Sequence, residues 1–176
     1  MNDYVYMARA IQLAQQGLYT THPNPRVGCV LVKNGQIIAE GFHARAGQGH
    51  AEVVALRQAG QEAEGATAYV TLEPCAHFGR TPPCANALVD AKVERVVMAS
   101  LDSNPLVAGK GKAILENAGI STMVGVLEHE AKALNQGFFR RMQGGLPYVR
   151  LKTAASLDGR TAMQSGESKW ITGSDA

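Results

Sequence analysis

Apolar and polar positions in the first third of the chain predict a helix, a β-hairpin and a second helix. The first apolar stripe has helical spacing and consists of Tyr4, Met7, Ala8, Ile11 and Ala14. Asp3 precedes this stripe as a candidate N-cap, and Gly17 follows it as a stop. Asn34-Gly35 separates two apolar runs and is typical of a type I′ hairpin turn. The elements expected here are a helix over 3–16, strands over 27–33 and 36–42, and a helix over 50–59.

The remainder of the chain alternates strand-like and helical segments. The expected elements are strands over 68–72, 95–100, 121–126 and 148–155, helices over 84–91, 110–118 and 127–142, and a turn at 156–159. Strands that alternate with helices favour parallel pairing with helices on both faces of the sheet. Together with the hairpin, this pattern predicts an α/β fold, a three-layer α/β/α sandwich around a mixed sheet.

Composition and charge narrow the class of protein. The chain is 45% hydrophobic and 18% charged with a net charge of +2, which is typical of a globular, soluble protein. Its Lys and Arg residues form no run that would attract nucleic acid through a long-range field. We find no apolar signal core and no membrane-length apolar segment, and we therefore expect a cytoplasmic protein without a nucleic-acid or membrane partner. The three cysteines, an odd number, argue against a disulfide scaffold.

Three short motifs contain the residue types of a zinc-dependent active site: His50-Ala51-Glu52, Pro74-Cys75 and Cys84. One imidazole and two thiolates leave the fourth position of a tetrahedral zinc for water, as in a catalytic site. The H-x-E pattern followed by P-C and a later Cys is typical of zinc-dependent nucleobase deaminases, in which the glutamate moves protons. We therefore expect His50, Cys75 and Cys84 to bind one zinc ion per chain, and Glu52 to be the catalytic residue.

The predicted local structure supports this assignment. His50 and Cys84 each lie where a helix is expected to begin, and the free N–H groups there favour the thiolate form of a cysteine. Glu52 is two residues from His50 and off its helical face, so it is better placed to accept a proton than to bind the metal. Cys29 lies inside an apolar strand and is expected to be a buried hydrophobic residue outside the site.

The spacing of the two candidate cysteine ligands departs from the commoner P-C-x-x-C pattern, since eight residues separate Cys75 from Cys84. With this spacing, the chain resembles a known family in the stretches THPNPRVG, GQGHAEVVAL, YVTLEPCAHFGRTPPC, DSNPLVAGKG, KTAASLDGR and GESKWIT. These motifs are similar to those of the bifunctional riboflavin-biosynthesis deaminase/reductases, and the resemblance covers the whole chain.

The resemblance implies a cytidine-deaminase-like fold and a hydrolytic deamination. The substrate would be 2,5-diamino-6-(5-phosphoribosylamino)pyrimidin-4(3H)-one, whose 2-amino group leaves as ammonia to give 5-amino-6-(5-phosphoribosylamino)uracil in riboflavin biosynthesis. The substrate contacts implied by the family are Asn24, His43, His77, Arg80, Asp102 and Asn104. Among them, Arg80 would bind the phosphate through its guanidinium. The family also suggests a homo-oligomer.

The resemblance further divides the chain into a deaminase domain over 1–145 and the beginning of a truncated reductase domain over 146–176. In the family the second domain uses NADPH; Ala154 and Trp170 would contact this cofactor, and Ser168 would contact substrate. We expect these residues to act only in an intact reductase domain, and we expect no reductase activity from this chain.

Alternatives to this function stay open. The chain could be a tRNA adenosine or cytidine deaminase of the same fold, a non-catalytic zinc-stabilised module, or a protein in which only the reductase matters. The long inter-cysteine loop weighs against the first, and the complete zinc motif weighs against the last. His77 and Arg80 could form a solvated loop, and Asn104-Pro105 a simple turn. The glycine-rich run over 109–112 lacks P-loop spacing and is expected to begin a helix.

Overall fold

The computed structural model of the chain describes residues 2–77, 82–105 and 107–168. The strands are β1 (Gly28–Lys33), β2 (Gln36–Phe42), β3 (Thr67–Val70), β4 (Arg95–Met98) and β5 (Ser121–Val124). The helices are α1 (Asp3–Gln15), α2 (Ala51–Ala59), the 3-10 turn η1 (Gly60–Ala63), α3 (Cys84–Asp90), α4 (Lys110–Asn117), α5 (Glu128–Leu134) and α6 (Gln136–Met142). Each strand and helix expected before residue 127 is present, with ends that differ by a few residues.

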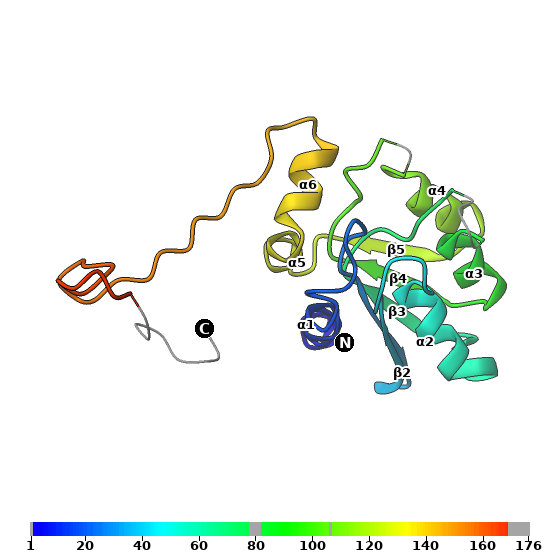
Figure 1. Ribbon diagram of the computed structural model, residues 1–176. Coiled ribbons are helices and arrows are strands. Elements are labelled where there is room, and N and C mark those ends of the chain that lie inside the picture. Colours follow the sequence, from blue (N-terminus) through cyan, green and yellow to red (C-terminus); the bar gives the residue numbers. More distant parts are fainter. Residues whose placement is uncertain (1, 78–81, 106, 169–176) are drawn as a thin grey trace.

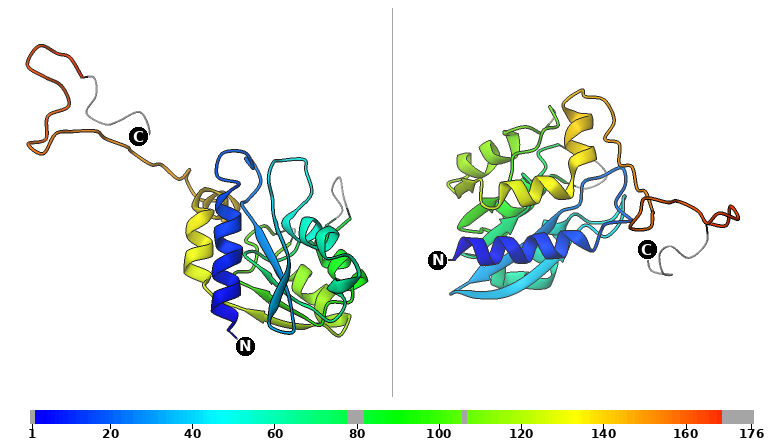
Figure 2. Two further views of the ribbon diagram at one scale, coloured as in Figure 1. Left: turned by 90° about the horizontal axis from the view of Figure 1, so that it is seen from below. Right: turned by 90° about the vertical axis from the view of Figure 1, so that its left-hand side faces the viewer.

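The five strands form one mixed sheet in the order β2-β1-β3-β4-β5. β1 pairs antiparallel with β2 and with β3, whereas β3, β4 and β5 run parallel to one another. Helices α2, α3 and α4 cover one face of the sheet, and α1 and α5 lie side by side on the other (Figure 1 and Figure 2). The predicted three-layer α/β/α architecture with a mixed sheet is therefore confirmed.

Alternating side chains of β1 divide the hydrophobic core between the two faces. Cys29 and Leu31 pack in the cluster formed with α2, α3 and α4, whereas Val30 and Val32 pack with Met7 and its neighbours in α1. All four strand residues are buried, which explains the continuous apolar run in the sequence. Cys29 is fully buried, as predicted.

The hairpin turn has the backbone that its sequence predicts. Asn34 and Gly35 have φ values of +52° and +76°, and a type I′ turn requires positive φ at both central positions. Asn tolerates this left-handed region better than most residues, and Gly adopts it without a steric penalty. The turn therefore fixes the pairing of β1 with β2.

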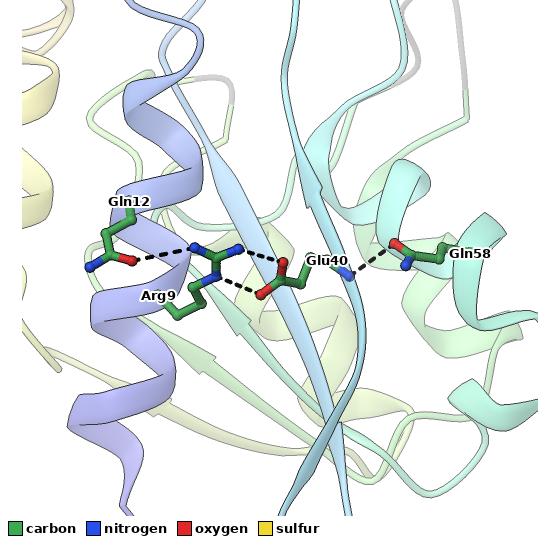
Figure 3. A network of polar contacts seen from close by, with 4 residues as sticks. All are labelled: Arg9, Gln12, Glu40 and Gln58. Carbon is green, nitrogen blue, oxygen red and sulfur yellow. Dashed lines mark hydrogen bonds and ion pairs between the residues drawn. The ribbon is translucent and has the colours of Figure 1, made fainter.

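Side chains from two helices cover the outer strand β2 (Figure 3). The Arg9 guanidinium of α1 forms a bidentate ion pair with Glu40, with Nε 2.6 Å from Oε1 and Nη2 2.8 Å from Oε2. The Arg9 guanidinium lowers the pKa of the Glu40 carboxyl. On the opposite side, the backbone N–H of Glu40 donates to Oε1 of Gln58 in α2 at 3.1 Å. A backbone donor of this edge is thus occupied and cannot pair with a foreign strand.

The start of α1 differs from the prediction. Asn2 occupies the N-cap position, and no side chain caps the helix there. Asp3 instead accepts two hydrogen bonds from the Arg95 guanidinium, at 3.0 and 2.8 Å, and one from the Tyr69 hydroxyl at 2.8 Å. Its carboxylate therefore joins α1 to β3 and β4, because a charged partner reached through tertiary packing competes successfully with the local capping role. The predicted apolar stripe is also partly wrong, since Tyr4 is 65% exposed.

We expect Asp3→Asn to lower the free energy of unfolding by about 1–3 kcal/mol at neutral pH, since the ion pair between Asp3 and Arg95 is lost. Hydrogen bonds from Arg95 hold the pKa of Asp3 below its ordinary value of 3.8. The stabilisation is therefore complete above that value and is lost as the pH falls through the lower pKa of the folded state. Urea unfolding at about pH 7 and about pH 3 should show a difference between variant and wild type that shrinks in acid. Asp90→Asn, at an exposed position, is the matched control and should change stability little at either pH.

The helix predicted over 127–142 is two helices. Asn135 interrupts it with φ −123° and ψ 29°, and separates α5 from α6. Leu127 precedes α5 in the left-handed region with φ +53°. Asn135 is only 5% exposed, and its side chain is hydrogen-bonded to the backbone of Arg26. A tertiary contact thus overrides the helical periodicity of this segment.

Residues 146–168 follow an extended course away from the sheet (Figure 1). The strand expected over 148–155 is wrong within this described segment, because it pairs with no described strand and its side chains are exposed. The predicted turn is present, since the Gly159 N–H donates to the Ser156 carbonyl at 2.9 Å. In the part of the chain that the structure describes, no helix has the length and apolar character needed to cross a membrane.

Candidate metal centre and active site

Loops that leave the carboxyl ends of three strands meet at one edge of the sheet. β2, β3 and β4 run in the same direction, so the segments that follow them lie together at this edge. The segment after β2 leads to His50, the segment after β3 contains Cys75, and the segment after β4 contains Asp102. The fold therefore brings together residues that are far apart in the sequence.

His50, Cys75 and Cys84 form a compact cluster of candidate metal ligands. Their donor atoms all lie within 4.8 Å of one another. His50 Nδ1 is 3.2 Å from Cys84 Sγ and 3.6 Å from Cys75 Sγ. Within the described residues, no other group of three or more His, Cys, Asp or Glu side chains has its donor atoms this close together. Cys29 is not part of it, in agreement with the prediction.

Two helix starts position these side chains. His50 is the N-cap residue of α2, and Cys84 is the first residue of α3. The Cys84 N–H donates to Cys75 Sγ at 3.2 Å, and the Ala85 N–H donates to the Cys75 carbonyl at 3.2 Å. Gly41 in β2 permits the close approach of α2, since a Cβ there would lie 2.3 Å from the Ala51 carbonyl oxygen. The helix that begins at His50 is thus seated directly on the sheet.

The cluster fits a zinc ion. Ligands of tetrahedral zinc, with bonds of about 2.0–2.3 Å, lie roughly 3.3–3.8 Å from one another. The separations of 3.2 and 3.6 Å between His50 Nδ1 and the two sulfurs are close to this range. Hydrogen bonding from Cys84 and from His50 lowers the pKa of the Cys75 thiol, which favours the thiolate that zinc requires. The contact with Cys75, together with burial, raises the pKa of the Cys84 thiol, and a bound cation would lower it. Three ligands leave a tetrahedral ion one position for water.

Glu52 lies beside this cluster in a buried position. It is 3% exposed and occupies the first turn of α2, two residues after His50. Burial, together with the charge of Cys75, raises the pKa of the Glu52 carboxyl to about 7. A cation bound by the three ligands would oppose this rise. A buried carboxyl that can hold or release a proton is suited to general acid–base chemistry.

A cavity of about 540 Å³ opens beside the cluster. Its lining contains His50, Glu52 and Cys75 together with Asn24, His43, His77, Asp102 and Asn104, which were predicted from the family resemblance. Arg80 and Trp170 lie outside the described residues. Ala154 and Ser168 are exposed in the extended segment and do not line the cavity. The glycine-rich run over 109–112 begins α4, as expected.

Hydrogen bonds define the protonation of His43 on the cavity wall. His43 is 2% exposed, with Nδ1 3.1 Å from the Gly49 carbonyl and Nε2 3.1 Å from Asn24 Nδ2. A carbonyl can only accept and an amide nitrogen can only donate, so the proton is on Nδ1 and Nε2 accepts from Asn24. Burial lowers the pKa of His43, which favours this neutral form. His43 thereby connects Asn24 to the residue that precedes His50.

Glu73 is a buried residue of the site that the sequence analysis missed. Its carboxylate accepts three backbone hydrogen bonds, from Asp102 at 3.1 Å, Gly109 at 2.9 Å and Lys112 at 3.0 Å. These contacts attach the loop after β4 and the start of α4 to the segment that leads into Cys75. Gly111 packs against this segment so closely that a Cβ would lie 2.0 Å from the Pro74 carbonyl oxygen. The position of Glu73 next to the P-C motif was visible in the sequence, but its burial and its backbone partners were not.

We expect Glu73→Gln to lower the free energy of unfolding by about 2–3 kcal/mol. A glutamine amide nitrogen cannot accept, so at least one of the three backbone N–H donors, such as that of Lys112, would lose its partner. Urea unfolding measures the loss. The exposed Glu94→Gln is the control with the same change of chemistry. A Glu73→Gln variant as stable as this control would contradict the role of Glu73.

The cavity wall also includes residues from α6 that the sequence did not predict. Phe138, Arg141 and Met142 line it on the side of Asn24. Arg141 donates from Nη2 to the Pro23 carbonyl at 3.0 Å, and its guanidinium lies over the Phe138 ring at 5.9 Å. The helical pattern over 127–142 carried no signal for these contacts, because it does not show which loop the helix faces.

Comparison with known proteins agrees with this architecture. A family model described as the cytidine and deoxycytidylate deaminase zinc-binding region matches residues 1–100. A second, described as the RibD C-terminal domain, matches residues 147–176. The solved structure of Acinetobacter baumannii RibD, form 1, has a TM-score of 0.89 and 67% identity over 98% of this chain and 49% of that chain.

Two curated relatives define the family more closely. Riboflavin biosynthesis protein RibD of Haemophilus influenzae is 64% identical over 99% of this chain, which spans only 47% of that protein. The diaminohydroxyphosphoribosylamino-pyrimidine deaminase of Buchnera aphidicola subsp. Acyrthosiphon pisum is 54% identical over 147 residues, 84% of this chain and 100% of that protein. The chain therefore belongs to the zinc-binding cytidine and deoxycytidylate deaminase family and, within it, to the diaminohydroxyphosphoribosylamino-pyrimidine deaminases.

Proposed function

We propose that this chain catalyses the hydrolytic deamination of 2,5-diamino-6-(5-phosphoribosylamino)pyrimidin-4(3H)-one to 5-amino-6-(5-phosphoribosylamino)uracil and ammonia in riboflavin biosynthesis. The observation that carries the proposal is the match to the whole length of the Buchnera deaminase at 54% identity. The His50, Cys75 and Cys84 cluster beside a buried Glu52 supports it, because hydrolytic deamination needs an activated water and a proton carrier at one place.

His50, Cys75 and Cys84 would hold the zinc ion, one per chain. When bound, zinc supplies a Lewis acid that lowers the pKa of a water to about 7. Glu52 would accept the proton of the attacking water and transfer it to the ring nitrogen adjacent to the reacting carbon. The water oxygen would bond to that carbon as a hydroxyl. Glu52 would then take the remaining proton from this hydroxyl and deliver it to the amino group, so that the C–N bond breaks, ammonia leaves and the oxygen remains as the carbonyl of the product.

The remaining cavity residues would orient the substrate. Asn24 and His43, which are hydrogen-bonded to each other, offer a polar wall for the pyrimidine or ribose. Asp102 and Asn104 lie in the loop after β4, where an Asp102 oxygen accepts from the Asn104 N–H at 2.7 Å, and would contact the ribose. Arg80 is the proposed phosphate ligand. Arg141 supports an anionic substrate, because it places a permanent positive charge on the described part of the wall.

Residues 146–176 are proposed to be the beginning of a reductase domain, with the boundary after Gly145. The match of residues 147–176 to the RibD C-terminal domain supports this division. Ala154, Ser168 and Trp170 would contact NADPH or substrate only where that domain is complete. We further propose a homo-oligomer that acts on a small phosphorylated pyrimidine and has no nucleic-acid partner.

An ammonia-release assay tests the function. The chain is incubated with the phosphoribosylaminopyrimidine, with cytidine and with an adenosine-bearing tRNA, each with and without a zinc chelator. We expect release from the pyrimidine alone, and its loss when the chelator removes the metal. Release from cytidine or the tRNA, with none from the pyrimidine, would overturn the assignment.

A further inference from the structure

The junction of α5 and α6 is fastened to the loop that carries Asn24. The Asn135 side chain accepts from the Arg26 N–H through Oδ1 and donates to the Arg26 carbonyl through Nδ2, both at 2.8 Å. The two residues are 109 positions apart in the sequence, and Asn135 is 5% exposed. The backbone N–H and the backbone carbonyl of Arg26 are therefore both hydrogen-bonded to one buried side-chain amide.

Asparagine is the side chain that suits this contact. An aspartate could accept from the N–H of Arg26 but would place a second oxygen against its carbonyl. A glutamine has the same amide on a longer side chain, which cannot occupy the same position without moving the loop. Asn135 makes this contact from a non-helical backbone conformation, and the helix is interrupted there between α5 and α6.

The contact reaches the active site through a short series of hydrogen bonds. On one side of Asn24, Asn135 holds Arg26; on the other, Arg141 holds the Pro23 carbonyl at 3.0 Å. Asn24 donates to His43 Nε2, and His43 donates to the Gly49 carbonyl next to His50. Residues 135 and 141 lie outside the segment matched by the deaminase zinc-binding family, residues 1–100. The support of Asn24 thus comes from helices beyond that segment.

We propose that Asn135 is a positioning residue for substrate binding, which acts by holding the loop that presents Asn24, the hydrogen-bond partner of His43, to the cavity. It is not among the residues that line this cavity, and lies instead on a second, adjoining cavity together with Asn24 and Arg26. This role rests on the proposed deaminase function, in which Asn24 contacts the substrate. Asn135 acts on the substrate only through Asn24 and His43, so its removal affects recognition more than the chemical step.

A double-mutant cycle in the 176-residue chain tests the proposal. Asn135→Asp should raise KM for the phosphoribosylaminopyrimidine by about tenfold with kcat changed less than about twofold. In an Asn24→Ala background the same substitution should change KM less than about twofold, because the residue through which it acts is already gone. Equal effects in both backgrounds, or an unchanged KM in the first, would overturn it. Gln136→Glu, an exposed amide-to-acid change at the next position, should leave KM unchanged.

A second variant and an NMR measurement keep the proposal testable if Asn135→Asp does not fold or if the wild type shows no deaminase activity. If Asn135→Asp does not fold, Asn135→Ser retains one hydrogen-bonding group and should give a smaller rise in KM that again depends on Asn24. If the wild type releases no ammonia from the pyrimidine, the proposed function fails, and NMR tests the contact on its own. The Asn24 side-chain amide signals should shift in the Asn135 variant and not in Gln136→Glu. Unmoved Asn24 signals would show that Asn135 does not position this residue.

Discussion

Replacing Glu52 by glutamine should lower kcat by about 10²- to 10⁴-fold while the zinc content stays at that of the wild type. The amide has nearly the shape of the carboxyl but cannot take a proton from water or deliver one to the leaving amine. Glu52 lies outside the cluster of donor atoms formed by His50, Cys75 and Cys84, so the metal ligands stay in place. Ammonia release measures the rate, and atomic absorption measures the bound zinc.

The control for this prediction is Glu94→Gln, which makes the same change at an exposed position outside the cavity. It should retain the wild-type kcat and zinc content. Two results would contradict the role of Glu52 as a proton carrier: a Glu52→Gln variant within about threefold of the wild-type rate, or one that loses its zinc. The second would make Glu52 a ligand and the site a closed, structural one.

Cys84→Ala should abolish both zinc binding and deamination. It removes one of three donors and leaves two, and the expected loss of metal affinity exceeds the roughly 10- to 100-fold that accompanies loss of an outer-shell partner. The same substitution deletes the sulfur that lies 3.2 Å from His50 Nδ1, although the Cys84 N–H still donates to Cys75. Zinc content after dialysis, followed by the ammonia assay, gives the result.

Cys29→Ala is the matched control, since Cys29 is equally buried but lies within β1 and outside the cluster. It should retain zinc and activity and lose only the packing of one sulfur atom. A Cys84→Ala protein that holds zinc as tightly as the wild type would remove Cys84 from the set of ligands. Retention of zinc with loss of activity would instead assign Cys84 a role in catalysis alone.

The residues of the candidate ligand cluster could be predicted because they belong to short motifs. His50 and Glu52 are two residues apart, and Cys75 follows a proline, so these residues can be identified from a few neighbouring positions in the sequence. The strands and helices around them follow from apolar periodicity, which the sheet then satisfies through alternating burial, as in β1. Their meeting at one edge follows from the parallel direction of β3 and β4.

The contacts of Asp3, Glu73 and Asn135 could not be predicted in this way. Asp3 bonds to Arg95, 92 positions away, and Asn135 bonds to Arg26, 109 positions away. The local sequence pattern favours a helix cap at Asp3 and a continuous helix through Asn135. Tertiary packing gives both residues different roles. The contacts of Glu73 could not be predicted either, since its three partners are backbone N–H groups and these are present at nearly every position of any sequence.

The segment between the two cysteines is closed at its base by two backbone donors. The N–H groups of Cys84 and Ala85 bond to the sulfur and the carbonyl of Cys75, each at 3.2 Å. The ends of the segment are therefore held together whatever its length. Because both contacts lie at the ends of the segment, residues between them can be replaced without moving Cys75 and Cys84, so the proposed substrate contacts can change independently of the proposed metal site.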